Sequence, residues 1–283
     1  MNLLKSVFVS AYLMAAMATT VFAALSLWNS HDFVTWSGVI LVTAPFVLVI
    51  SWLMLFRNVA RTSAHFPSLI WLGLAGVVLA SWGYVQGGSP NAPVLALAGW
   101  VGFLIYVYWY SSFNRHASNQ LGFGKMLPEF ELTDATGKVI NSASLTDKPV
   151  VWIFYRGNWC PLCMAQIKEL VGQYKELQEL GVRVALISPQ PHKFTIGLAR
   201  KFNVPFDFLT DDGNRAAHVL GINNPHGLPM GMQMLGYDSD TVLPTVVITD
   251  AGGRILWAHE TDNYRVRPEP DVYLAVLRDN QTV

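Results

Sequence analysis

The stretch that decides the fold reads Val-Val-Trp-Ile-Phe-Tyr-Arg-Gly-Asn-Trp-Cys-Pro-Leu-Cys and runs from Val150 to Cys163. Its first six residues form a continuous apolar run, which is typical of a strand buried on both faces of a sheet. The following residues, Met164–Leu180, carry leucine, isoleucine and valine at helical spacing, and Gly181 is a suitable C-cap. The sequence therefore predicts a buried strand that leads through two cysteines into a helix.

The two cysteines of this stretch, Cys160 and Cys163, are the only ones in the sequence. At the start of a helix, free N–H groups and the helix dipole stabilise a thiolate, and Pro161 suits the first helical position. A structural zinc site needs four ligands, and neither a second cysteine pair nor a finger-like histidine pair follows. The pair is therefore predicted to be redox-active, with no metal or cofactor.

The elements around the motif alternate between strand and helix. A hairpin is predicted ahead of it, with strands at Phe130–Leu132 and Lys138–Ile140. After the motif we expect the strand Val182–Ile187, the helix Lys193–Phe202, the strand Phe206–Leu209, the helix Asn214–Leu220, the loop Gly221–Asp240, the strands Thr245–Thr249 and Arg254–Ala258, and the helix Pro270–Arg278. This order predicts an α/β domain with a mixed central sheet over residues 126–283.

The segment Phe154–Cys163 resembles the peroxiredoxin-like branch of the thioredoxin superfamily, the alkyl hydroperoxide reductase C and thiol-specific antioxidant proteins. The resemblance runs from about Leu121 to the C-terminus and includes Asp262–Pro270. It implies a thioredoxin-like fold and an antioxidant oxidoreductase that reduces hydroperoxides, with a dithiol protein such as a thioredoxin as reductant.

The match departs from the family pattern, Pro-x-x-x-Thr/Ser-x-x-Cys, at two of its positions. Its cysteine corresponds to Cys163, its hydroxyl residue to Cys160 and its proline to Arg156. The arginine that the family carries before its late strand is also missing, because Leu243 and Pro244 stand there. Leu243-Pro244-Thr245 instead resembles the turn that carries a cis-proline in thioredoxins, although the sequence does not show the isomer.

These departures leave two mechanisms open. In a thiol peroxidase, Cys163 attacks the peroxide and Cys160 then condenses with the sulfenic acid. The resemblance implies that an arginine steadies the thiolate, and the candidates are Arg156, Arg265 and Arg267. The resemblance favours this mechanism.

In a disulfide reductase the two cysteines exchange roles. The N-terminal thiol, Cys160, attacks a disulfide of a partner protein and Cys163 resolves the mixed disulfide. Trp159 and Pro244 would then shape the docking surface. A non-catalytic membrane assembly module is a third hypothesis, but degenerate domains usually lose a cysteine and this sequence keeps both.

The N-terminal part of the sequence has a different composition. It contains four runs of 20 or more residues without Asp, Glu, Lys or Arg, which is the length that a bilayer core requires. The runs are Ser6–Trp28, Val34–Phe56, Phe66–Val85 and Pro93–Phe113. They predict an all-α, four-helix transmembrane region over residues 1–114, joined to the redox domain by a linker at 115–125.

The first run also resembles a signal peptide, with Lys5 as its basic residue and a small-residue cleavage site at Val21-Phe22-Ala23. Its apolar stretch is longer than a signal peptide normally has, so we expect a retained helix. Arg57, Arg61 and Arg115 flank the helices on the same side as Lys5, whereas the other two connections carry no Lys or Arg. The positive-inside rule therefore predicts that both termini and the redox domain are cytoplasmic.

The distribution of charged residues and one methionine-rich loop indicate which partners to expect. Residues 1–120 carry four basic residues and one acidic residue, and the remainder carries 15 basic and 18 acidic residues. Neither part shows the basic stripe that nucleic-acid binding requires. Met230, Met232 and Met234 predict a flexible apolar loop, which would suit a substrate, a second copy in a homodimer or membrane lipid.

Overall fold

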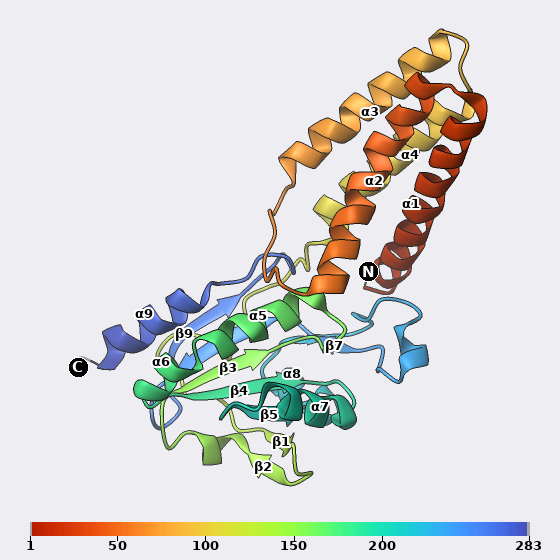
Figure 1. Ribbon diagram of the computed structural model, residues 1–283. Coiled ribbons are helices and arrows are strands. Elements are labelled where there is room, and N and C mark those ends of the chain that lie inside the picture. The colour runs from red at the N-terminus through yellow and green to blue at the C-terminus, as the bar shows by residue number, and fades with distance from the viewer. Residues whose placement is uncertain (1, 282–283) are drawn as a thin grey trace. The chain divides into compact units, whose positions relative to one another are not determined.

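The computed structural model describes residues 2–281 and is shown in Figure 1. The described part of the chain divides into two compact units. A helical unit comprises Leu4–Phe56 and Ser63–Ser112, and a larger unit comprises the remaining described residues, among them the segment Arg57–Thr62.

The helical unit is built from four long apolar helices. They are α1 (Asn2–Ser30), α2 (Phe33–Phe56), α3 (Pro67–Val85) and α4 (Asn91–Ile105), and a π-helical turn, Tyr106–Tyr110, continues α4. Each of the four, with that turn added to α4, is long and apolar enough to cross a membrane. The four helices expected from the sequence are confirmed.

Small residues allow two of these helices to approach closely. A Cβ atom on Gly38 of α2 would lie 2.6 Å from the carbonyl oxygen of Gly76 and 2.5 Å from the backbone nitrogen of Ala80, both in α3. Only glycine fits there, so backbone packs against backbone, as is common between membrane helices.

The larger unit contains a seven-stranded sheet in the order β2-β1-β5-β4-β3-β8-β9. Its strands are β1 (Glu131–Asp134), β2 (Val139–Asn141), β3 (Val150–Phe154), β4 (Arg183–Ser188), β5 (Asp207–Thr210), β8 (Thr245–Thr249) and β9 (Ile255–Glu260). The central strands β3, β4 and β5 are parallel, and β1, β2, β8 and β9 are added antiparallel. The predicted α/β thioredoxin-like fold with a mixed sheet is confirmed.

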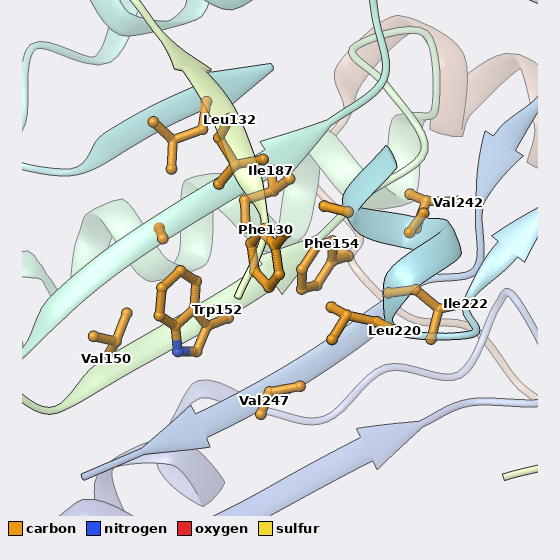
Figure 2. Packing of buried hydrophobic residues seen from close by; sticks show 14 of the residues in the cluster. Phe130, Leu132, Val150, Trp152, Phe154, Ile187, Leu220, Ile222, Val242 and Val247 are labelled. Carbon is orange, nitrogen blue, oxygen red and sulfur yellow. The ribbon is translucent and has the colours of Figure 1, made fainter. Parts of the chain in front are cut away.

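The core explains why β3 is an interior strand of the sheet, between β4 and β8. Trp152 and Phe154 share one face of this strand and pack with Leu220 and Ile222, which follow α8 (Arg215–Val219), as Figure 2 shows. Trp152 satisfies its buried ring nitrogen by donating to the Thr249 hydroxyl at 3.0 Å. Burial of a side chain such as Phe154 contributes about 1.5–3 kcal/mol to folding.

The other helices of this unit are α5 (Pro161–Gly172), α6 (Tyr174–Glu179), α7 (His192–Phe202) and α9 (Pro270–Gln281). The prediction of one continuous helix over Met164–Leu180 was wrong. The helix starts earlier, at Pro161, and is interrupted at Gln173, whose φ and ψ are −104° and 14°. Gly172, a poor helix former, precedes the interruption. Gly181 has the positive φ expected of a C-cap.

The predicted loop Gly221–Asp240 is also more structured than expected. Its residues Asn223–Asn224 (β6) pair with Thr241–Val242 (β7), and Met232–Leu235 forms a 3-10 turn. The side chain of Met234 is 91% exposed. The short β6–β7 pair therefore ties down the two ends of a loop that presents an apolar tip.

Candidate active site

The cysteine pair lies where β3 passes into α5. The chain leaves β3 at Phe154, and Cys160 is the extended N-cap residue of α5, with Pro161 in the first turn. The backbone carbonyl of Cys160 accepts the first helical hydrogen bond from the Met164 N–H at 3.1 Å. Both cysteines are free thiols, and both side chains are buried.

The environment of Cys163 favours its thiolate. Burial alone would raise the pKa of this thiol. Four other interactions outweigh burial and lower the pKa of Cys163 to about 5. They are a hydrogen bond from Cys160, the positive charge of Arg267, the backbone N–H of Arg156 and the charge of Arg156. The Nη2 atom of Arg267 lies 3.5 Å from the sulfur.

The pKa of Cys160 moves in the opposite direction. The pKa of Cys160 is raised well above its usual value by its hydrogen bond to Cys163, by burial and by the negative charge of the Cys163 thiolate. The charges of Arg267 and Arg156 oppose this shift. The pair therefore consists of an anionic sulfur at Cys163 and a protonated thiol at Cys160 that donates to it.

Other hydrogen bonds fix the guanidinium of Arg267. Its Nε donates to the carbonyl oxygen of Tyr264 at 3.1 Å, and its Nη1 donates to Oε1 of Gln166 at 3.4 Å. Gln166 lies one helical turn after Cys163 in α5, and its side-chain amide donates to the Tyr273 hydroxyl at 2.9 Å. The arginine is therefore held by both α5 and the segment that precedes α9.

The other two candidate arginines lie nearby but are used differently. The guanidinium of Arg156 stacks over the Trp159 ring at 4.6 Å and donates to the Gly227 carbonyl at 2.5 Å. Arg265 is buried, and its backbone donates to the Asn263 side chain and accepts from the Thr62 N–H. Among the three arginines left open by the sequence, the structure places the Arg267 guanidinium beside the sulfur of Cys163.

The turn before β8 differs from the thioredoxin turn that its sequence resembles. No peptide bond in the described residues is cis, so the Leu243–Pro244 bond is trans. The carbonyl of Pro244 accepts from Arg115, which also donates to Thr245 and pairs with Glu260 at 2.5 Å. Arg115, from the linker, thus contacts the turn at which this sequence lacks the arginine of the family pattern.

Sequence reasoning missed the buried side chain of Gln190. It accepts from the Asn158 N–H at 2.8 Å and donates to the Tyr155 hydroxyl at 3.1 Å, so it fixes the loop between β3 and Cys160. A signal was present, because Gln190 follows the predicted strand Val182–Ile187 closely. The carboxyl ends of parallel strands meet at one edge of a sheet, and this edge carries the cysteines.

Gly157 provides a test of this loop. Its φ is +145°, and a Cβ atom there would lie 2.6 Å from Nε1 of Trp159. We expect Gly157→Ala to lower the free energy of unfolding by about 1–3 kcal/mol, because an L residue is strained at this φ. Thermal unfolding of the full-length protein, followed by circular dichroism, measures the loss.

The matched control is Gly172→Ala, near the end of α5. A Cβ atom there meets no atom within 4 Å, and no positive φ is required. This variant should unfold at the wild-type temperature or slightly above it. Equal unfolding temperatures for the two variants would show that the loop tolerates a side chain at Gly157.

Comparison with known proteins agrees with this geometry. The model of the AhpC/TSA family matches residues 123–258, which include β3, the cysteine pair and β8. This region is therefore similar to the AhpC/TSA family and to the peroxiredoxin Q proteins. The relationship supports a thiol-dependent redox function for the domain.

Individual relatives cover only part of the chain. The chloroplastic peroxiredoxin Q of Populus jackii is 32% identical over 35% of this chain and 46% of its own length. The thiol-disulfide oxidoreductase ResA of Bacillus cereus is 25% identical over 46% of this chain and 72% of its own. The crystal structure of the peroxidoxin BcpB from Mycobacterium tuberculosis covers 58% of this chain and 98% of its own at 23% identity, with a TM-score of 0.47.

This chain spans about half the length of the peroxiredoxin Q proteins that it matches. The residues that the AhpC/TSA family model matches, 123–258, follow the four apolar helices in the sequence.

Proposed function

We propose that the protein is a thiol peroxidase in which Cys163 attacks a hydroperoxide and Cys160 resolves the product. One observation carries the proposal: the Arg267 guanidinium lies 3.5 Å from the sulfur of Cys163, whose pKa is lowered to about 5. At neutral pH this sulfur is a thiolate, which is the form that attacks peroxide.

The chemistry balances with these two residues and one reductant. The Cys163 thiolate attacks the terminal oxygen of ROOH and the O–O bond breaks, so that the hydroxyl stays on the sulfur as a sulfenic acid. The alkoxide RO⁻ leaves and takes a proton from water to become the alcohol. The Cys160 thiol then forms a disulfide with it, and water leaves. A dithiol protein such as a thioredoxin reduces this disulfide and is itself oxidised.

Access to the pair also favours a small substrate. The side chain of Cys160 is 2% exposed and its pKa is raised, so it is neither presented to a partner protein nor ionised at neutral pH. A disulfide reductase would need Cys160 as an accessible thiolate, whereas attack on a hydroperoxide needs the thiolate that Cys163 provides. The match to ResA favours disulfide reduction as the second candidate function.

Membrane anchoring is the second part of the proposal. Four helices of sufficient length and apolarity precede the peroxiredoxin-like domain. Lys5, Arg57, Arg61 and Arg115 all belong to one side of such an arrangement, which supports a cytoplasmic location for both termini and the redox domain.

The two candidate functions differ in the oxidant that the reduced protein consumes. We expect one equivalent of hydrogen peroxide to convert the full-length protein in neutral detergent to the Cys160–Cys163 disulfide, with the loss of two thiols. Insulin, as a protein disulfide, should react more slowly. Thiol titration and intact mass measure both reactions. A faster reaction with insulin than with hydrogen peroxide would show that the protein is a disulfide reductase and not a peroxidase.

A further inference from the structure

A cavity of about 240 Å³ lies in the larger unit, between residues of α5 and α7 and beside the cysteine motif. Asn158 and Met164, which line it, flank the motif in sequence: Asn158 lies two residues before Cys160, and Met164 directly follows Cys163. Asn158 also accepts a hydrogen bond from the Tyr237 hydroxyl. The cavity is therefore adjacent to the reactive pair without including either cysteine.

The lining of this cavity is strongly basic. Four cationic side chains contribute to it, and no carboxylate occurs among the described residues that line it. The cations are Arg57, Lys168, Lys193 and Lys201. Glu169, the neighbour of Lys168, pairs with Arg61 at 2.5 Å, so its charge is already compensated.

The remaining lining is apolar and lies close to the charges. The ammonium group of Lys193 lies 5.1 Å from the centre of the Phe194 ring, and that of Lys201 lies 5.9 Å from the centre of the Phe202 ring. Both rings line the cavity, together with Leu198. Such a site suits a ligand with an anionic group joined to an apolar part.

We propose that this cavity binds a phosphate group, supplied by the headgroup of a phospholipid. Several cations around one cavity provide the donors that phosphate oxygens require, and basic pockets of this kind bind lipid headgroups. Arg57 directly follows the last residue of α2, Phe56. The lipid source rests on the proposed membrane anchoring, which would hold Arg57 at the level of the headgroups.

The test is calorimetric titration of the full-length protein in neutral detergent, with inorganic phosphate in one arm and dihexanoyl phosphatidylglycerol in the other. We expect both to bind, and the lipid to bind more tightly because its glycerol and acyl groups contact the apolar wall. The double variant Lys193→Ala/Lys201→Ala should weaken the binding of both ligands by about tenfold or more. Both lysines are exposed residues of α7, so the variant should fold.

The matched control is Lys138→Ala/Lys175→Ala, which removes the same charge from exposed lysines that do not line the cavity. We expect it to bind within about twofold of the wild type. Equal weakening in both double variants, or no binding of either ligand, would overturn the site. Phosphate binding as tight as lipid binding would overturn the lipid source alone. None of these titrations needs peroxide or a reactive thiol, so their failure is distinguishable from failure of the peroxidase.

Discussion

Replacing Cys163 with serine is expected to abolish the reaction with hydrogen peroxide, with a rate loss of about 10⁴-fold or more, the scale on which loss of a nucleophile acts. The reason is that Cys163 is the ionised member of the pair, with a pKa of about 5, whereas the pKa of Cys160 is raised. A stopped-flow single turnover, followed by peroxide consumption, measures the loss in full-length protein.

Cys160→Ser is the matched control for this result. Serine restores the hydroxyl that the family pattern carries at this position, and its O–H can still donate to the Cys163 sulfur. The first step should therefore survive, while the reaction stops at the sulfenic acid, which intact mass detects as one added oxygen. If Cys163→Ser instead consumes peroxide at the wild-type rate, Cys163 is not the nucleophile.

Removing the charge of Arg267 is expected to have the second-largest effect. In the wild type, the rate of peroxide attack should be constant above about pH 6 and fall through a midpoint near pH 5, because protonation removes the thiolate. Arg267→Met should move this midpoint upward by about 1 to 3 pH units. It should also slow attack about 100-fold at saturating pH, because a charged donor to the reacting sulfur is lost.

Two further substitutions at arginine positions separate charge from structure. Arg267→Lys retains the positive charge, so its midpoint should stay near pH 5, but it loses the planar group that contacts both Gln166 and the Tyr264 carbonyl. Arg215→Met removes an exposed arginine of α8 and should leave the profile unchanged. A wild-type pH profile for Arg267→Met would show that the low pKa has another source.

The fold was largely predictable because its signals are local. The apolar run of β3, the spacing after Cys160 and the four uncharged stretches each specify an element through its own residues. The break at Gln173 was missed because the apolar pattern continues through it, and periodicity does not register a single non-helical residue.

The site was predictable only in part, because its electrostatics depend on residues far apart in the sequence. The cysteines and Pro161 could be placed from the motif alone. The motif alone could not decide among Arg156, Arg265 and Arg267, because that choice depends on how the segment before α9 folds back to the start of α5. Gln166 looked like an ordinary helix residue, because its bonds to Arg267 and Tyr273 cross between elements.

The separation of 104 residues between Cys163 and Arg267 has a consequence for how the protein is made. While the chain is being synthesised, the cysteines emerge long before Arg267, one of the groups that lower the pKa of Cys163. Until the segment before α9 has folded into place, Cys163 lacks the charge of Arg267, so its pKa is higher and a smaller fraction of it is thiolate. In mildly acidic solution a copy in which this segment has folded should therefore react with peroxide faster than a nascent or misfolded copy.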